Sequence, residues 1–517
     1  MSESINVEKT TVKNKFPKPH IRKQKQLKKL DDDYQMSIES AQKAEILLTE
    51  EQGLIETEGM EKSWRFKQDD IVKNVDVSTA NKRFDLNLPA YGPYNIDYSR
   101  NGRDLLICGK KGHVASFDWR LGQLHTELHL NETVHAAKYL QNNQLFAVAQ
   151  KKYVYIYNYE GAEVHKLDQH LDPTLLEFLP YHYLLVSAGK SGFIKYHDIS
   201  TGEIVGQLHT KLGPTVSLRQ NPWNAVIQAG HGNGQITFWS PSMNTPLVKI
   251  QACRGPVRSI AVNRDGRYMA AFSADQTLKI WDIRKFDELD SYVTPTQANT
   301  VDISDTGLLS VGWGPHVTVW KDCFKGHQKN PYLTHLIPGS QVQSTRFVPF
   351  EDILGVGHNK GFASLIVPGA GESNFDALEV NPYETTKMRR EGEVRSLLTK
   401  LQPDMITLDP NVVGTVDRRK PHERLSAKEQ AERELAEKEA KDGKSNLERY
   451  VKPEVKSKNS ALRKLKRKQK KNLITERSMR IEKILAKEKE LRQQKAQLEK
   501  QIQTKKDELE TAFDRFK

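Results

Sequence analysis

The densest group of like-charged side chains in the sequence lies near the C-terminus. Residues 461–471 read ALRKLKRKQKK, and seven of these eleven side chains are basic. Cations at this density neutralise phosphates, so the run favours contact with a nucleic-acid backbone or a role as a nuclear import signal. A solvated linker is the third interpretation, although no acidic residue dilutes the run. The seven candidates for RNA contact are Arg463, Lys464, Lys466, Arg467, Lys468, Lys470 and Lys471.

This basic run offers no side chain that reads bases. No aromatic residue occurs between Tyr450 and Phe513, whereas single-stranded RNA is read mainly by stacking its bases on aromatic side chains. We therefore expect the run to contact the RNA backbone. Such binding is sequence-tolerant and weakens steeply with salt, because each neutralised phosphate releases a counterion.

A second basic stretch lies near the N-terminus. Residues 9–29 contain nine basic residues and no acidic one, and Pro17 and Pro19 interrupt any helix there. We expect an extended basic arm, for which nucleic-acid contact, nuclear import and plain solvation all stay open. The candidates for RNA contact in this stretch are Lys18, Arg22 and Lys23.

A third set of candidate phosphate contacts precedes a predicted helix. Over residues 391–401, apolar side chains recur at helical spacing, which predicts an amphipathic helix packed on another element. Arg389 and Arg390 stand at its start and are candidates for RNA contact. A solvated helix face is the alternative interpretation of the same residues.

The sequence shows no constellation typical of catalysis or metal binding. Residues 189–192, GKSG, resemble half a phosphate-binding loop, but Leu184 stands where the first glycine is required, and the segment joins two predicted strands. The cysteines form no CxxC pair, which predicts buried free thiols. We expect no enzymatic activity, no metal site, no cofactor and no small-molecule substrate. The three cysteines are Cys108, Cys253 and Cys323.

The charge of the chain is concentrated in one part. The net charge is +13 over 517 residues. Residues 1–80 hold 14 basic and 15 acidic side chains, residues 81–380 hold 28 and 27, and residues 381–517 hold 37 and 24. The whole excess therefore lies in the C-terminal part, which favours a polyanionic partner. The polar N-terminus and the lack of a long apolar run predict no secretory signal and no membrane span.

A repeated strand pattern is expected to position these charged segments. Residues 257–283, VRSIAVNRDGRYMAAFSADQTLKIWDI, read as three short strands with two turns, and the third strand ends in Trp281-Asp282. This matches the WD repeat, which builds one four-stranded blade of a β-propeller. Comparable strand ends precede it at intervals of 40, 40, 42 and 42 residues, at Asp118, Asn158, Asp198 and Ser240.

Two later copies bring the number of repeats to seven. Trp320 lies 39 residues after Trp281, and a last copy fills residues 342–367. A single blade cannot bury its two faces, so we predict an all-β protein with one closed seven-bladed propeller over residues 81–380. The alternating residues 83–88 are expected to complete the last blade, which removes the exposed sheet edges.

The remaining segments predict charged arms on either side of the propeller. Residues 1–80 form an N-terminal arm with a helix over 34–51, and residues 418–517 form a basic arm that is helical by propensity. Both arms are too polar to fold alone, and we expect them to take extended or helical form on a partner. Trp64 and Phe66 are expected to dock on a partner or on the propeller edge.

Residues 331–417 form a segment unlike the charged arms, and it overlaps the last repeat. Its apolar and turn-forming content predicts that it is ordered against the propeller. It resembles the signature C-terminal segment of the nucleolar WD-repeat proteins of the small-subunit processome, the U3 small nucleolar RNA-associated particle. The residues that carry the resemblance are PFED (349–352), GVGH (355–358), PGAGE (368–372), NFD (374–376) and NPYE (381–384).

This resemblance implies a non-catalytic scaffold that binds pre-ribosomal RNA and other processome proteins, including WD-repeat subunits, for 18S rRNA processing in the nucleolus. The alternative is a WD-repeat adaptor or chromatin-associated receptor that binds a peptide on the propeller face, which the repeats alone do not exclude.

Overall fold

The computed structural model describes residues 21–44, 52–377, 379–412, 473–475 and 484. The chain divides into two compact units, residues 1–51 and residues 52–517. The described part of the first unit is one helix, α1 (Ile21–Ala44). The expected extended conformation of residues 9–29 is therefore wrong from Ile21 onward, because no proline follows Pro19 within this stretch and Lys, Gln and Leu favour a helix. Residues 9–20 of that stretch lie outside the described residues. So do residues 45–51 of the helix predicted over residues 34–51.

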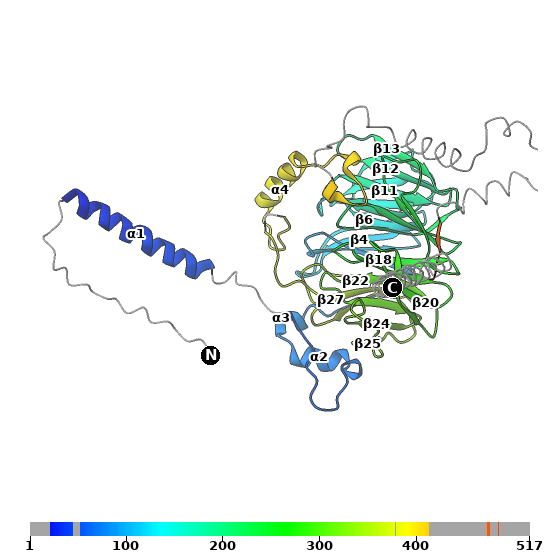
Figure 1. Ribbon diagram of the computed structural model, residues 1–517, viewed down its shortest axis with the longest axis horizontal. Coiled ribbons are helices and arrows are strands. Elements are labelled where there is room, and N and C mark those ends of the chain that lie inside the picture. The colour runs from blue at the N-terminus through cyan, green and yellow to red at the C-terminus, as the bar shows by residue number, and fades with distance from the viewer. Residues whose placement is uncertain (1–20, 45–51, 378, 413–472, 476–483, 485–517) are drawn as a thin grey trace, which may run out of the picture. The chain divides into compact units, whose positions relative to one another are not determined.

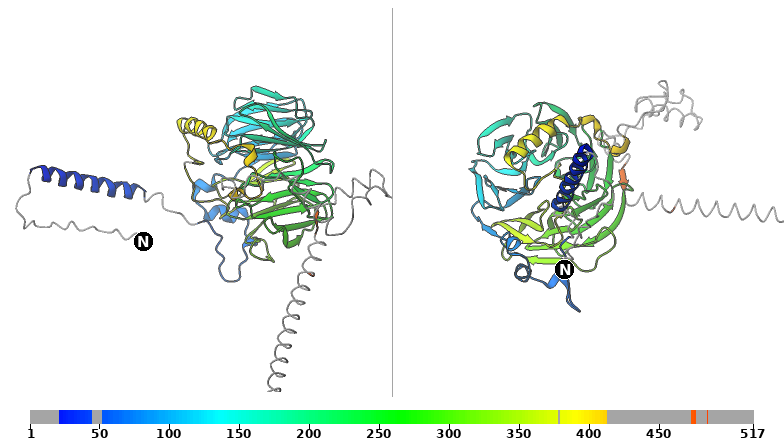
Figure 2. Two further views of the ribbon diagram at one scale, coloured as in Figure 1. Left: turned by 45° about the horizontal axis from the view of Figure 1, so that its top comes forward. Right: turned by 90° about the vertical axis from the view of Figure 1, so that its left-hand side faces the viewer.

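The second unit is a seven-bladed β-propeller, which confirms the predicted fold (Figures 1 and 2). Blade 1 is β2 (Tyr94–Tyr98), β3 (Asp104–Gly109), β4 (His113–Asp118) and β5 (Gln123–His129). Blade 2 is β6 (Val134–Tyr139), β7 (Leu145–Gln150), β8 (Val154–Asn158) and β9 (Glu163–Leu167). Blade 3 is β10 (Pro173–Leu179), β11 (Leu184–Gly189), β12 (Phe193–Asp198) and β13 (Ile204–His209).

Blade 4 has five strands, β14 (Thr215–Gln220), β15 (Ile227–His231), β16 (Gln235–Trp239), β17 (Val248–Gln251) and β29 (Leu473–Thr475). Blade 5 is β18 (Val257–Val262), β19 (Tyr268–Ser273), β20 (Thr277–Asp282) and β21 (Asp287–Val293). Blade 6 is β22 (Ala298–Ile303), β23 (Leu309–Trp313), β24 (His316–Trp320) and β25 (Leu333–Leu336). Blade 7 is β26 (Val342–Phe347), β27 (Ile353–His358), β28 (Gly361–Ile366) and β1 (Asp85–Asn87).

The ring closes with one strand from the N-terminal side. β1 pairs antiparallel with β28, with Leu86 opposite Phe362, so the predicted completion of the last blade is confirmed. The first strand of each blade lines the central channel and contacts the first strands of both neighbouring blades. Apolar side chains fill the space between blades, and Trp239 and Trp281 are each 1% exposed there. The three cysteines are buried free thiols, as predicted.

Residues 63–80 pack on the propeller, although their charge groups them with the N-terminal arm. They form η2 (Ser63–Arg65), α2 (Gln68–Asn74) and α3 (Val77–Ala80). Ile71 is 7% exposed in the core of blades 6 and 7, and Phe66 packs against the same core, as expected. The Gln68 amide donates to the Ile366 carbonyl and accepts from the Ile366 N–H, both at 2.9 Å. A count of charges misses these few apolar anchors.

Among the described residues, no helix is long and apolar enough to cross a membrane.

Candidate nucleic-acid interface

A long segment crosses one face of the propeller after the last blade. We call residues 368–412 the strap; they contain α4 (Thr386–Leu398), η3 (Pro403–Met405) and η4 (Pro410–Val412). The strap lies on the face where the first strand of each blade turns into the second, which we call the strap face (Figure 2, right). The Thr306 hydroxyl of blade 6 donates to the Gly369 carbonyl at 2.8 Å, and Arg264 of blade 5 pairs with Glu372.

The strap then contacts blades 1 to 3 in turn. In blade 1 the Arg100 guanidinium donates to Glu379 at 3.0 Å, and the Asn101 amide donates to Glu384 at 3.1 Å. The contacts with the next two blades are Arg389 with Asn143 at 3.5 Å, the Leu401 N–H with the Tyr181 carbonyl at 2.9 Å, and Lys400 with Ser200 at 2.6 Å and with Asp198.

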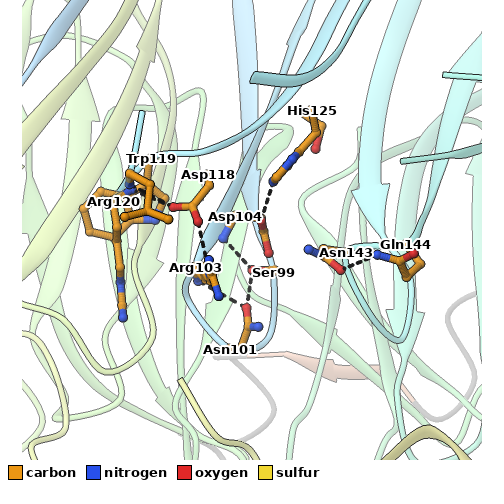
Figure 3. A network of polar contacts seen from close by, with 12 residues as sticks. Ser99, Asn101, Arg103, Asp104, Asp118, Trp119, Arg120, His125, Asn143 and Gln144 are labelled. Atoms are coloured by element: carbon orange, nitrogen blue, oxygen red, sulfur yellow. Dashed lines mark hydrogen bonds and ion pairs between the residues drawn. The ribbon is translucent and has the colours of Figure 1, made fainter. Parts of the chain in front are cut away.

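A polar network holds the blade 1 turn that receives the strap (Figure 3). The Ser99 hydroxyl donates to Asn101 at 2.6 Å and accepts from the Asp104 N–H at 2.9 Å. The Arg103 guanidinium donates to Asp118 at 2.7 Å, and this charge-assisted bond ties the turn to β4. Asn101 is therefore fixed before its amide meets Glu384 of the strap.

The strap ends in an apolar anchor on blade 4. Ile406 is 1% exposed and belongs to the core cluster of blades 3 to 5. The Ser240 hydroxyl donates to the Ile406 carbonyl at 2.8 Å, and the Asn224 amide donates to the Leu408 carbonyl at 3.0 Å. Because these two bonds and one buried side chain close the strap, Ile406 is the residue on which its docking most depends.

Substitution of Ile406 by Asp should release the end of the strap. A buried Ile truncated to a small residue loses about 2–5 kcal/mol, and an unpaired carboxylate adds a desolvation cost. We expect proteolysis of full-length protein near residues 399–405 to accelerate by about a hundredfold or more, with little change at the blades. The exposed Met405→Asp variant is the matched control and should be cut at the wild-type rate. Equal cutting of all three proteins would contradict this docking.

Helix α4 forms close to the predicted position, but its expected packing is wrong. Val394 is 58% exposed and Leu398 is 82% exposed, so the apolar residues at helical spacing face solvent. The helix contacts the propeller through polar side chains instead, because Ser396 bonds to Tyr183 and Arg389 bonds to Asn143. The periodicity identified the helix correctly but not the face that packs.

The structure separates the sequence-predicted RNA contacts. Arg389 is half-buried against blade 2, whereas its neighbour Arg390 is exposed on α4. Lys23 is exposed on α1, and Arg22 lies in the same helix. Lys18 and the basic run of residues 461–471 lie outside the described residues.

The residues just after the basic run are attached to the propeller. β29 adds parallel to the outer strand β17 of blade 4, with Ile474 opposite Ile250. Ile474 is half-buried and packs against the same core cluster as Ile406. The helical form predicted for the basic arm of residues 418–517 is therefore wrong at Leu473–Thr475, where pairing with an open sheet edge outweighs helix propensity.

The central channel holds a ring of alternating charges that the sequence analysis missed. Equivalent positions near the ends of the first strands carry acidic and basic side chains in turn, with alanine in blade 5. Lys138 lies 3.1 Å from Asp97 and 3.2 Å from Glu177. The ring, in blade order, is Asp97, Lys138, Glu177, Arg219, Ala261, Asp302 and Arg346.

The ring is paired almost throughout. Arg219 spans the blade 5 gap, because its guanidinium contacts Asp302 and lies 3.7 Å from Glu177. Arg346 closes the circle at 3.4 Å from Asp97. Burial raises the pKa of Asp302, while Arg219 acts in the opposite direction. The acidic and basic side chains of the ring therefore serve as one another's counterions. A cavity of ≈ 620 Å³ lies between the ring and the strap, lined in part by Arg264 and Glu379.

One cluster has residue types that bind metals. His113, Glu127 and His129 place their ligand atoms within 4.8 Å of one another on β4 and β5. The Glu127 carboxylate lies 3.1 Å from His113 Nε2 and 3.6 Å from His129 Nε2. The two imidazole rings are stacked, 5.2 Å apart and 24° from parallel. An ion ligated by a histidine lies in its ring plane, so these rings would have to turn before they shared one ion. We interpret the cluster as hydrogen-bonded packing.

Comparisons with known proteins agree with this architecture. Residues 331–409 match the family model described as the BING4CT (NUC141) domain, and residues 244–282 match the WD domain, G-beta repeat. The first range spans β25, the strands β26, β27 and β28 of blade 7, and the strap up to its blade 4 anchor. The match to the family model therefore includes most of the strap, the segment that lies on the strap face.

Three relatives align over most of the chain. U3 small nucleolar RNA-associated protein 7 of Saccharomyces cerevisiae is 52% identical over 95% of this chain and 92% of its own length. WD repeat-containing protein 46 of Homo sapiens is 41% identical over 85% of this chain and 71% of its own length. The Caenorhabditis elegans protein of that name is 42% identical over 76% of this chain and 68% of its own length. The chain thus belongs to the family of BING4CT-containing WD-repeat proteins that includes U3 small nucleolar RNA-associated protein 7.

Proposed function

We propose that this protein is a non-catalytic scaffold subunit of the small-subunit processome in the nucleolus. It binds pre-ribosomal RNA within the U3 small nucleolar RNA particle, together with other processome proteins, and serves 18S rRNA processing. The name of the 52% identical yeast relative, which associates that protein with U3 small nucleolar RNA, is the observation that carries the proposal. The charge distribution agrees with it, since the +13 excess lies after residue 380.

The geometry suggests how the parts divide this work. We propose an N-terminal arm (1–80), a propeller (81–380), a family-specific segment (331–417) and a basic arm (418–517), with residues 63–80 used for docking. The strap and β29 both end on blade 4, so residues 413–472 connect two points of one blade. The propeller then sets where the basic run is presented, and the run supplies charge. The strap occupies part of the strap face, which leaves less of that face for a peptide, and together with the name of the yeast relative this leads us to favour the RNA scaffold.

The basic run is tested by replacing its seven Lys and Arg residues with Gln in the full chain, with an unrelated import signal added. Loss of seven charges should lower the slope of log affinity against log salt by up to about 5, because each phosphate contact releases nearly one counterion. RNA crosslinking and 18S maturation in cells should fall with it.

A variant that exchanges every Lys for Arg and every Arg for Lys in the run is the matched control. It keeps the charge and should keep both readouts, because backbone contact needs no particular cation. Wild-type crosslinking and maturation in the Gln variant would show that the run is only an import signal. RNA contact would then have to be sought at Arg389, Arg390, Lys18, Arg22 and Lys23.

A further inference from the structure

We propose that the propeller carries a second RNA-backbone contact, an arc of lysines on the face opposite the strap. This inference deepens the proposed function and rests on it. In each blade the turn between the second and third strands lies away from the strap face, because the strands are antiparallel. In blades 7, 1, 2 and 3, which are neighbours in the ring, these turns present six lysines, all exposed. They are Lys360, Lys110, Lys111, Lys151, Lys152 and Lys190.

The arc is held in place by its backbone while its charges stay available. The Val134 N–H of blade 2 donates to the Lys110 carbonyl at 3.2 Å, and the Asp172 N–H of blade 3 donates to the Lys152 carbonyl at 2.9 Å. The turns of blades 1 and 2 are thereby bonded to the chain that enters the next blade. Within the described residues, none of the six ammonium groups forms an ion pair. Lys111 Nζ donates only to the Ala90 carbonyl, at 3.1 Å.

Few acidic groups oppose the arc. Glu132 and Asp172 are the exposed acids in the loops that lead from these blades to the next, and Asp168 nearby is paired with Lys166 at 2.9 Å. Glu127 on β5 is also exposed and lies 3.1 Å from His113, next to the blade 1 turn. Six lysines against Glu127, Glu132 and Asp172 leave a net charge of +3. The equivalent turns of blades 4, 5 and 6 hold no lysine, and the blade 5 turn holds Asp275. The net charge of +1 over residues 81–380 therefore conceals a propeller with one cationic side.

The lysines of different blades act on a common region. His135 lies on β6, the channel-lining strand of blade 2, and burial lowers its pKa. The charges of Lys190 in blade 3 and Lys110 in blade 1 lower that pKa further. The turns on either side of blade 2 thus raise the positive potential at the channel mouth on this face, where a phosphate backbone would gain most from several cations at once.

Aromatic side chains beside the arc favour RNA over an acidic protein. Tyr91 is 38% exposed, and its ring lies 5.5 Å from His113 and 5.1 Å from His129, next to the turn of Lys110 and Lys111. In blade 2 the Lys152 ammonium lies 5.1 Å from the Tyr153 ring. An exposed aromatic ring beside cations is how proteins hold unpaired nucleotides, whereas an acidic peptide gains little from stacking.

The test replaces Lys110, Lys111, Lys151 and Lys152 with Gln in the full chain and measures binding of a fluorescent stem-loop RNA over a salt series. We expect affinity to fall on the order of tenfold and the salt slope to decrease by up to about 3. The matched control removes four exposed cations elsewhere. These are Arg284, Lys285, Lys325 and Lys329, in blades 5 and 6. This control should change affinity by less than about twofold, because charges beyond a Debye length are screened.

The outcomes separate the arc from the proposed function. Equal losses of RNA affinity in the arc variant and the control would overturn the arc, and so would wild-type affinity in the arc variant. In either case, loss of RNA binding when the basic run is changed to Gln would still support the proposed function. No RNA binding by the wild type would overturn both. Displacement of the RNA by poly-L-glutamate at equal charge would assign the arc to an acidic protein. Ultraviolet crosslinks in peptides that contain Tyr91 or Tyr153 would support RNA.

Discussion

Substitution of Arg219 by Met is expected to destabilise the propeller by about 3–5 kcal/mol, because it leaves two buried carboxylates without their shared cation. Glu177 and Asp302 are 6% and 4% exposed at their side chains, and Arg219 is the residue that links them. Blade 5 contributes only Ala261 to the ring, so Asp302 loses its ion-pair partner, whereas Glu177 keeps Lys138 at 3.2 Å. Met retains most of the apolar stem, which confines the change to the charge.

The loss of Arg219 should be recoverable. Addition of Glu177→Gln and Asp302→Asn removes the two carboxylate charges that Arg219 had contacted, and we expect the triple variant to regain at least about half of the lost stability. The destabilisation of the single variant should also shrink as pH falls, because burial raises the pKa of Asp302 and a protonated acid needs no counterion. Urea unfolding followed by tryptophan fluorescence measures both effects.

Arg258→Met is the control for this series. Arg258 lies on β18 of blade 5 and is exposed, so its replacement should stay within about 0.5 kcal/mol of wild type. A stability loss of that small size for Arg219→Met would mean that water, rather than the ring, compensates Glu177 and Asp302. A triple variant less stable than the single one would instead show that the contacts of Glu177 with Lys138 and of Asp302 with the Phe347 N–H outweigh the loss of the cation.

The ring also illustrates what sequence reasoning reaches and what it misses. The spacing of strand ends fixes the number of blades, because each blade must stack on two others, and the alternation in residues 83–88 is enough to predict the closing strand. The charge ring needs one further step, since its members recur at one position of the first strand in each repeat. Aligning the seven repeats would have placed Asp97, Lys138 and Arg346 in register.

Other features depend on tertiary contacts that no local pattern records. The leucines of α4 have helical spacing, but which face packs is decided by polar contacts with Asn143 and Tyr183. The net charge of the propeller does not reveal the lysine arc, because that sum combines a cationic face with the other surfaces of the propeller. In the sequence Ile474 lies in a charged segment that favours a helix. It forms a strand because the open edge of β17 pairs with it, a contact that the local sequence does not record.

Deletion of residues 1–88 should abolish the stable fold, whereas deletion of residues 1–51 should leave it intact. The first unit ends at Glu51, so the shorter deletion removes none of the propeller contacts described above. The longer one removes β1 and with it the pairing that closes the ring. It also removes Phe84, whose ring lies 5.3 Å from that of Phe362, and Ile71 in the core of blades 6 and 7.

The magnitude follows from what the longer deletion exposes. Full burial of a large apolar side chain contributes about 1.5–3 kcal/mol. Ile71 is buried, while Phe84 and Leu86 are partly buried, so the three together contribute roughly 3–6 kcal/mol before the lost strand pairing is counted. A typical domain is stable by about 5–15 kcal/mol, so the truncated ring should be largely unfolded or aggregated at 25 °C. Circular dichroism and hydrogen exchange of β28 amides measure this directly.

A complementation experiment separates loss of the closing segment from general damage. A synthetic peptide of residues 63–88, added in trans during refolding of the 89–517 chain, should restore the cooperative transition, because it supplies β1 and the Gln68 bonds to Ile366. The same peptide with Leu86 and Ile71 changed to Asp should not. Full stability of the chain that lacks residues 1–88 would show that six complete blades and a three-stranded seventh suffice. Failure of the peptide to rescue an unfolded chain would show that closure requires covalent continuity with β2.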